Sequence, residues 1–264
     1  MKDAAQDNAA ALRQHVMSTY NSLRLGIAII GAALPILLWL GETYFGSGQL
    51  LWSMSAYYHS VMRDIFVGAL IALGLCLYLY KGFGTKENWA LNLAGVFAVL
   101  IAIVATYAPG QPPTLSTKAH GVFSVALFLC IAYVSIFRAK DTLLLLADQE
   151  RIQKLRRTYR ALGVGMIVSP LVAVALTFML DPRGSGRTVR FFVEAVGIWM
   201  FAAYWLVKSR ELRATGAESL AIEGRLEAAP TPEVKSEALS PMESAVPEGS
   251  LVRVDAPPNP PAGG

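Results

Sequence analysis

Six ionisable side chains lie in or beside long apolar stretches of this sequence, a setting in which charged groups are costly and are usually functional. They are His59, Arg63, Asp64, His120, Asp181 and Glu194. Imidazole and carboxylate groups bind metal ions such as zinc and also act as general acids and bases. We therefore predict a polar site in which His59, His120 and Asp64 ligate a metal, for which zinc fits the ligand types. Asp64 and Glu194 are the predicted catalytic carboxylates.

The segment SMSAYYHS, which contains His59, adds further candidates. Ser55 is included among the catalytic residues, and Tyr58, Arg63 and Asp181 are predicted to contact a ligand or to support the site. Without a metal, Arg63 is the expected ion-pair partner of Glu194 or Asp181. Each residue also has an interpretation without function, because carboxylates suit helix N-termini, arginine reaches headgroups and tyrosine anchors helices at membrane interfaces.

The elements that must position these residues are membrane-spanning helices. Of the 264 residues, 54% are apolar and 16% are charged, and the mean hydropathy is +0.45, which excludes a water-soluble domain. Six stretches are long and apolar enough to cross a bilayer, without the alternation of a barrel strand. They are Leu25–Gly41, Val61–Tyr80, Trp89–Ala108, Ala119–Phe137, Ala161–Leu180 and Phe191–Val207. The predicted fold is an all-α, six-helix transmembrane bundle.

Basic residues near the span ends predict the orientation of this bundle. With a cytoplasmic N-terminus, 14 Lys and Arg residues lie inside and 5 lie outside, as the positive-inside rule requires. Both termini are then cytoplasmic, and the expected location is the inner membrane of a bacterium. The sequence pI is about 9.1, but no basic run alternates with exposed aromatic residues, so the bilayer and not nucleic acid is the expected partner.

The chain divides by composition into three parts. Residues 1–24 form a polar N-terminal lead, residues 25–213 the transmembrane domain, and residues 214–264 a tail rich in Ala, Pro and Glu. The tail has no periodic apolar positions with which to bury a core. It is therefore predicted to be disordered and dispensable for folding.

Helix geometry predicts where the polar residues meet. Alternate spans begin at the same membrane face, so the second, fourth and sixth spans bring His59, His120 and Glu194 to the outer side. Ser60 is the predicted N-cap of the second span, which leaves His59 before the helix and free to turn inward. A shared metal requires the His59 and His120 ring nitrogens to lie about 3 to 4 Å apart. Small residues, Gly68, Gly74 and Gly95, are expected to permit close helix contact.

Two resemblances follow from these motifs. The stretches SAYYHSVMRDIFVGALIALGLCLYLYKG, NLAGVFAV and FFVEAVGIWMFAAYWLVK, together with His120, resemble a family of uncharacterised bacterial multi-span membrane proteins over about Ile27 to Lys208. Ser55, His59 and Asp64 also follow the order of the zinc-site residues in the superfamily of alkaline ceramidases and progestin and adipoQ receptors. The late HxxxH pair of that superfamily has no counterpart, so His120 and Glu194 take its place in the implied site.

Two classes of function fit these residues. The first is a metal-dependent hydrolase of a lipid amide or ester at the outer interface, in which the metal activates water and a carboxylate is the base. The second is a non-enzymatic protein, a sensor or transporter that binds a lipid or small molecule through the same groups. Haem ligation by His59 and His120 is a third chemical option. Metal content of the His59→Ala and His120→Ala variants is the measurement that separates the first class from the others.

Overall fold

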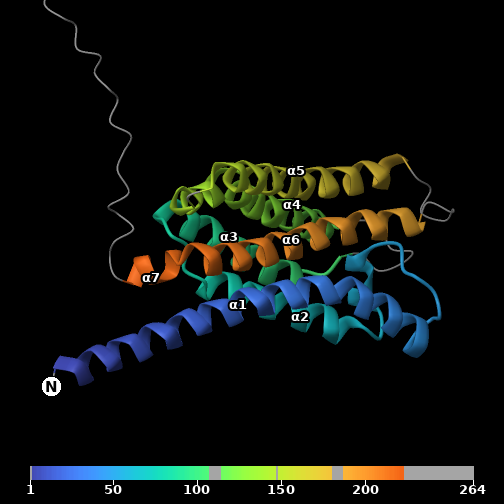
Figure 1. The fold of residues 1–264 in the computed structure, drawn as a ribbon. Coiled ribbons are helices and arrows are strands. Elements are labelled where there is room, and N and C mark those ends of the chain that lie inside the picture. Colours follow the sequence, from blue (N-terminus) through green and yellow to red (C-terminus); the bar gives the residue numbers. More distant parts are fainter. Residues whose placement is uncertain (1, 107–113, 147, 180–186, 223–264) are drawn as a thin grey trace, which may run out of the picture. The chain divides into compact units, whose positions relative to one another are not determined.

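A computed structural model describes residues 2–106, 114–146, 148–179 and 187–222 (Figure 1). Every regular element in these ranges is helical, which confirms the predicted all-α class. The main helices are α1 (Lys2–Phe45), α2 (Arg63–Leu79), α3 (Thr85–Ile103), α4 (Leu115–Tyr133), α5 (Gln149–Met179), α6 (Arg187–Thr215) and the short α7 (Ala217–Ile222). A 3-10 helix, η1 (Met54–His59), precedes α2.

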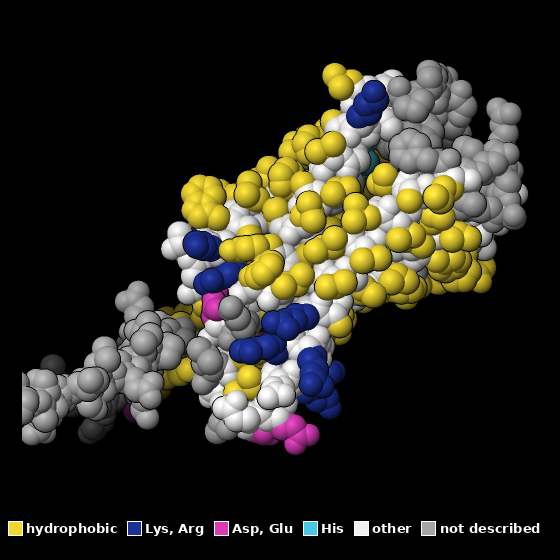
Figure 2. Space-filling view, turned by 90° about the horizontal axis from the view of Figure 1, so that it is seen from above, with side chains coloured by type: hydrophobic (Ala, Val, Ile, Leu, Met, Phe, Trp, Pro, Cys, Tyr) yellow, Lys and Arg dark blue, Asp and Glu magenta, His cyan; other side chains and the backbone are white. Residues whose placement is uncertain are grey.

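Five of the described helices are long and apolar enough to cross a membrane: α1, α3, α4, α5 and α6. Only 28% to 44% of the residues in their apolar stretches are buried inside the protein. On the face drawn in Figure 2, hydrophobic side chains cover most of the middle of the molecule. Such an apolar outer surface is unfavourable in water and suits lipid, so the fold is that of a multi-pass membrane protein.

The principal helix contacts follow chain order and close into a ring. Each helix from α1 to α5 packs against the next, and α6 packs against both α5 and α1 (Figure 1). The predicted glycine contact holds between α2 and α3, where a Cβ on Gly95 would lie 2.6 Å from the carbonyl oxygen of Gly74. Gly68 meets nothing within 4 Å and has no such role. The ring of six helices encloses the region in which a ligand cavity is found.

Two groups of buried aromatic residues fill the ring near its opposite ends. Trp205 of α6 contacts Tyr80 edge to face, with ring centroids 5.0 Å apart. Tyr57 of η1 is fully buried and packs on Phe191 at the start of α6, with a centroid distance of 5.9 Å. The second contact anchors η1 inside the bundle, beside the cavity.

The segment between α4 and α5 consists largely of short helical turns. After α4 the chain makes a π-helical turn, η2 (Val134–Arg138), and two 3-10 turns, η3 (Ala139–Asp141) and η4 (Leu143–Leu145). Ser135 donates a hydrogen bond to the carbonyl of Tyr159 at 2.8 Å and is fully buried. These turns fold back onto α5 and α6 and carry polar residues into the protein.

Both ends of the chain differ from the sequence-based division. The polar lead is the first part of α1, which runs without a break from Lys2 to Phe45. The predicted tail begins too early, because α6 extends to Thr215 and α7 follows after Gly216. Ala217 is fully buried, and α7 packs on α1 and α6. The remaining tail, residues 223–264, lies outside the described residues.

Candidate active site

An internal cavity of about 150 Å³ lies within the ring of helices. All six long helices and η1 contribute to its wall, which consists mainly of Leu, Ile, Phe, Val and Ala side chains. The polar side chains in the wall are Ser55, His120, Ser124, Ser169, Arg190 and Glu194. Most of them lie at the end where α4 and α6 begin. The cavity therefore has an apolar body and a polar end, which suits a ligand with a hydrocarbon chain and a polar group.

Ser55 and His120 form a hydrogen-bonded pair at the polar end. The distance from Ser55 Oγ to His120 Nε2 is 3.0 Å, and Nδ1 of the same ring lies 2.6 Å from the carbonyl oxygen of Val104. A carbonyl only accepts, so Nδ1 carries the proton and Nε2 of the neutral ring presents its lone pair to Ser55. The Ser55 hydroxyl then donates to His120.

Local structure fixes both members of this pair. His120 is in the second turn of α4, whose start is closed by a capping box between Thr114 and Thr117. Ser55 is in the first turn of η1, which is capped by Ser53 through a hydrogen bond from the Ala56 N–H of 3.2 Å. His120 is only 4% exposed. The imidazole is thus shielded from bulk solvent and held in one orientation and one tautomer.

Glu194 connects η1 to α6. Its Oε2 accepts a hydrogen bond from the N–H of Met54 at 2.7 Å, and its Oε1 accepts one from Arg190 Nε at 2.9 Å. The Arg190 guanidinium also lies over the Trp52 ring, 4.7 Å from its centroid. Glu194 therefore fixes the backbone immediately before Ser55, and an Arg–Glu pair lies in the cavity wall.

Tyr57 holds the other side of η1. Its hydroxyl oxygen accepts a hydrogen bond from the N–H of Leu51 at 3.4 Å. Burial raises the pKa of Tyr57 to about 12, so the phenol remains protonated at physiological pH. The result is a rigid segment on which Ser55 is presented to His120.

The other predicted site residues lie outside the cavity wall. His59 is exposed, and its Nε2 lies 2.8 Å from the carbonyl oxygen of Thr106. Arg63 donates to the Tyr58 hydroxyl at 3.1 Å, while the ion-pair partner of Glu194 is Arg190, so the pairing of Arg63 with Glu194 was wrong. Asp64 is exposed in the first turn of α2. Asp181 lies outside the described residues.

The structure does not assemble the predicted metal site. Within the described ranges, no group of three His, Cys, Asp or Glu side chains lies close enough to hold a metal ion. Both ring nitrogens of His120 already have hydrogen-bond partners in Ser55 and Val104. The predicted residues separate into an internal group with Ser55, His120 and Glu194, and a surface group around His59. The local reason is that η1 ends at His59 with Ser60 as its C-cap, while α2 begins at Arg63 with Met62 as its N-cap, so Ser60 does not cap α2.

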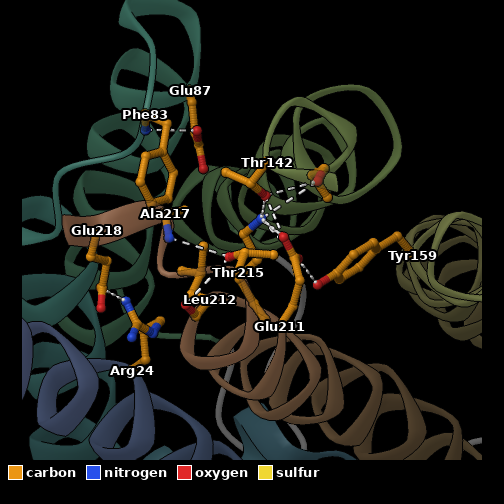
Figure 3. A network of polar contacts seen from close by, with 12 residues as sticks. Arg24, Phe83, Glu87, Thr142, Tyr159, Glu211, Leu212, Thr215, Ala217 and Glu218 are labelled. Carbon is orange, nitrogen blue, oxygen red and sulfur yellow. Dashed lines mark hydrogen bonds and ion pairs between the residues drawn. The ribbon is translucent and has the colours of Figure 1, made fainter. Parts of the chain in front are cut away.

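A second polar cluster, missed from the sequence, lies where α6 ends (Figure 3). Lys208 and Glu211 are 1% and 2% exposed. Lys208 Nζ donates to Thr142 Oγ1 at 2.6 Å and to Glu211 Oε2 at 3.1 Å, and Glu211 also accepts from the hydroxyls of Thr142 and Tyr159. The only sequence signal was a Lys and a Glu three residues apart in α6. Through Thr142, the cluster holds the segment between α4 and α5 against α6.

Comparison with known proteins adds no relative. No family model, no curated protein and no solved structure matches this chain.

Proposed function

We propose that this protein is a serine-dependent hydrolase of lipid esters or amides, embedded in the bacterial inner membrane. The observation that carries the proposal is the Ser55–His120–Val104 arrangement at the polar end of an apolar cavity. It has the three parts of an activated nucleophile: a hydroxyl, an imidazole base within hydrogen-bonding distance and a group that orients the base. Because the His59, Asp64 and His120 donors do not converge, the proposal uses no metal.

The reaction proceeds through an acyl-enzyme. Ser55 Oγ attacks the carbonyl carbon of the lipid while its proton passes to His120 Nε2. The Nδ1–H of His120 keeps its hydrogen bond to the Val104 carbonyl oxygen, which stabilises the imidazolium. When the tetrahedral intermediate collapses, the C–O or C–N bond breaks and the leaving group takes the proton from Nε2. A water molecule then attacks the acyl carbon while its proton passes to His120 Nε2. The bond from the acyl carbon to Ser55 Oγ breaks, the fatty acid leaves, and Ser55 Oγ takes the proton back from Nε2.

The Arg190–Glu194 pair lies in the same wall. The negative charge that develops on the substrate carbonyl oxygen is stabilised by hydrogen-bond donors and cations already in place. Arg190 brings a guanidinium to this end of the cavity, and Glu194 fixes its direction through Nε. We assign Arg190 to orientation of the lipid headgroup or the oxyanion, and Glu194 to positioning.

The bilayer itself supplies the substrate through the face between α5 and α6. A groove there, of about 470 Å³, is lined by apolar residues and by Ser169. Ser169 also lines the internal cavity, so it separates the groove from the interior. An acyl chain that lies in the groove is one side chain away from the catalytic cavity. The proximity of this lipid-facing groove to the cavity supports a membrane lipid rather than a water-soluble ester as substrate.

In the proposed topology, α2 crosses the membrane in addition to α1, α3, α4, α5 and α6, which gives six spans, and both termini are in the cytoplasm. The 17 residues of α2 extend about 25 Å at 1.5 Å per residue, at the lower limit for a span. Most Lys and Arg side chains in Figure 2 lie toward the end where α6 finishes, which supports that end as cytoplasmic. In a Cys76→Ala, Cys130→Ala background, Ser47→Cys should react with an impermeant thiol reagent in intact cells, and Lys86→Cys should not. The reverse pattern would refute this orientation.

The activity test uses the purified full chain in detergent or nanodiscs. A fluorophosphonate probe should label the wild-type protein, and long-chain p-nitrophenyl esters should be hydrolysed in the presence of EDTA. Ser55→Ala should abolish labelling, and His120→Gln should lower the hydrolysis rate at least about a hundredfold. Ser18→Ala, on the exposed start of α1, is the matched serine control.

Two results would overturn the enzymatic proposal. One is hydrolysis that persists unchanged in Ser55→Ala. The other is lipid binding by the wild-type protein without labelling or turnover, which would identify the site as a non-enzymatic lipid-binding cavity.

A further inference from the structure

A fully buried arginine lies at the end of the bundle opposite the candidate active site. Arg24 of α1 is 0% exposed and forms an ion pair through Nη1 with Glu218 of α7 (Figure 3). Its Nε and Nη2 atoms are buried and have no hydrogen-bond partner within the described part of the chain. Buried N–H groups without partners are costly, and a guanidinium edge of this kind is suited to the paired oxygens of a phosphate or carboxylate.

A cavity of about 530 Å³ lies next to this arginine. Its wall includes Glu218 and Tyr80, the two residues that contact the Arg24 guanidinium, and Lys81. Side chains of α1 and α7 make the rest of the wall largely apolar. The Arg24 guanidinium lies behind the Glu218 and Tyr80 side chains of this wall, and the rest of the cavity surface is largely apolar. This combination suits an anionic group attached to a hydrocarbon chain, or a small anion alone.

Glu218 is on a short helix that directly follows a glycine. α6 ends at Thr215, and Gly216 follows with a φ of +62°, a left-handed conformation that favours glycine. α7 contains only six residues, too few to be stable as an isolated helix. Its position on α1 therefore depends on the Arg24–Glu218 pair and on the buried Ala217.

We propose that Arg24 is the anion-binding residue of a second ligand site, and that Glu218 occupies this site as an internal competitor. The ligand class is a phosphate group, carried by a phospholipid or free in solution. When it binds, its oxygens replace the Glu218 carboxylate and also accept from Nε and Nη2, and α7 is released. The site lies at the end proposed to be cytoplasmic, and it goes beyond the hydrolase function.

The test is a thermal-unfolding titration of the full chain with two probes, each at constant ionic strength. Inorganic phosphate is added to protein in a zwitterionic detergent, and nanodiscs of phosphatidylglycerol are compared with nanodiscs of phosphatidylcholine. Glu218→Gln keeps the shape of the side chain and removes its charge. We expect this variant to bind phosphate or phosphatidylglycerol about tenfold more tightly than the wild type, because the competitor is gone.

The control is the double variant Arg24→Gln, Glu218→Gln, which leaves no unpaired charge buried and should show no anion response. A response to inorganic phosphate identifies a free anion as a ligand, and a response to phosphatidylglycerol alone identifies a lipid headgroup. Equal responses of wild type and Glu218→Gln, or an undiminished response of the double variant, would overturn the proposal. Hydrolysis by Ser55 is measured separately, so failure of one proposal is distinguishable from failure of the other.

Discussion

Lys208 and Glu211 form an ion pair one turn apart on α6, with an Nζ to Oε2 distance of 3.1 Å and side chains that are 2% and 0% exposed. Removal of one partner leaves the other charge buried without compensation, which typically costs about 3 to 5 kcal/mol. We predict losses of this size in the free energy of unfolding for Lys208→Met and for Glu211→Leu. The measurement is reversible unfolding in mixed micelles.

The double variant Lys208→Met, Glu211→Leu is the control for this pair. Replacing a whole buried ion pair by apolar residues is often nearly neutral, so the double variant should lose much less than the sum of the single variants. Additive losses would show that the two residues act independently, contrary to their ion pair and to the Thr142 hydroxyl that contacts both.

The fold was largely predictable from hydropathy, because the bilayer imposes a minimum length on each apolar helix. The short elements were not predictable in this way. Neither η1 nor the turns between α4 and α5 have a hydrophobic period of their own, and both depend on packing against α6. The position of α7 likewise depends on a contact between residues 194 positions apart, Arg24 and Glu218.

The candidate site was predictable only in part. Alternating helices predict the depth of a residue in the membrane, so His59, His120 and Glu194 were expected at one end of the bundle, and His120 and Glu194 lie in the wall of one cavity. The alternation of helices does not predict the direction in which a side chain points. That direction separates His120, which faces the cavity, from His59, which contacts the Thr106 carbonyl at the surface. Lys208 and Glu211 were missed because charged residues near a span end are normally solvated.

Glu194 should act as a positioning residue, and the nature of its replacement tests this role. Glu194→Ala removes the acceptor for the Met54 N–H and should reduce the labelling rate of Ser55 about tenfold, equivalent to roughly 1.4 kcal/mol. Glu194→Gln keeps an oxygen at this place and should restore most of the rate. If both variants lose the same activity, the carboxylate charge is required and Glu194 takes part in the chemistry.

Gly197 sets the distance between α5 and α6 at Ser169. A Cβ on Gly197 would lie 2.4 Å from Ser169 Oγ and 3.0 Å from its Cβ, so Gly197→Ala forces the two helices apart. We expect a loss of about 1 to 3 kcal/mol, as for other overpacked sites, and partial recovery in the double variant with Ser169→Ala. Gly68→Ala is the matched control, since a Cβ there meets nothing within 4 Å. Equal effects at the two glycines would contradict the close packing.

Truncation before and after α7 tests whether this short helix belongs to the folded domain. A chain that stops after Gly216 loses the carboxylate that pairs with the fully buried Arg24. In phosphate-free buffer its unfolding free energy should fall by about 3 to 5 kcal/mol, the usual cost of an orphaned buried charge. A chain that stops after Ile222 retains α7 and is the control, so its thermal unfolding temperature should stay above that of the shorter chain.

A third variant tests the cause of the loss. Addition of Arg24→Gln to the shorter chain should restore part of the lost stability, because the uncompensated charge is then gone. Equal stability of the two truncated chains would show that the Arg24–Glu218 contact contributes nothing to the fold.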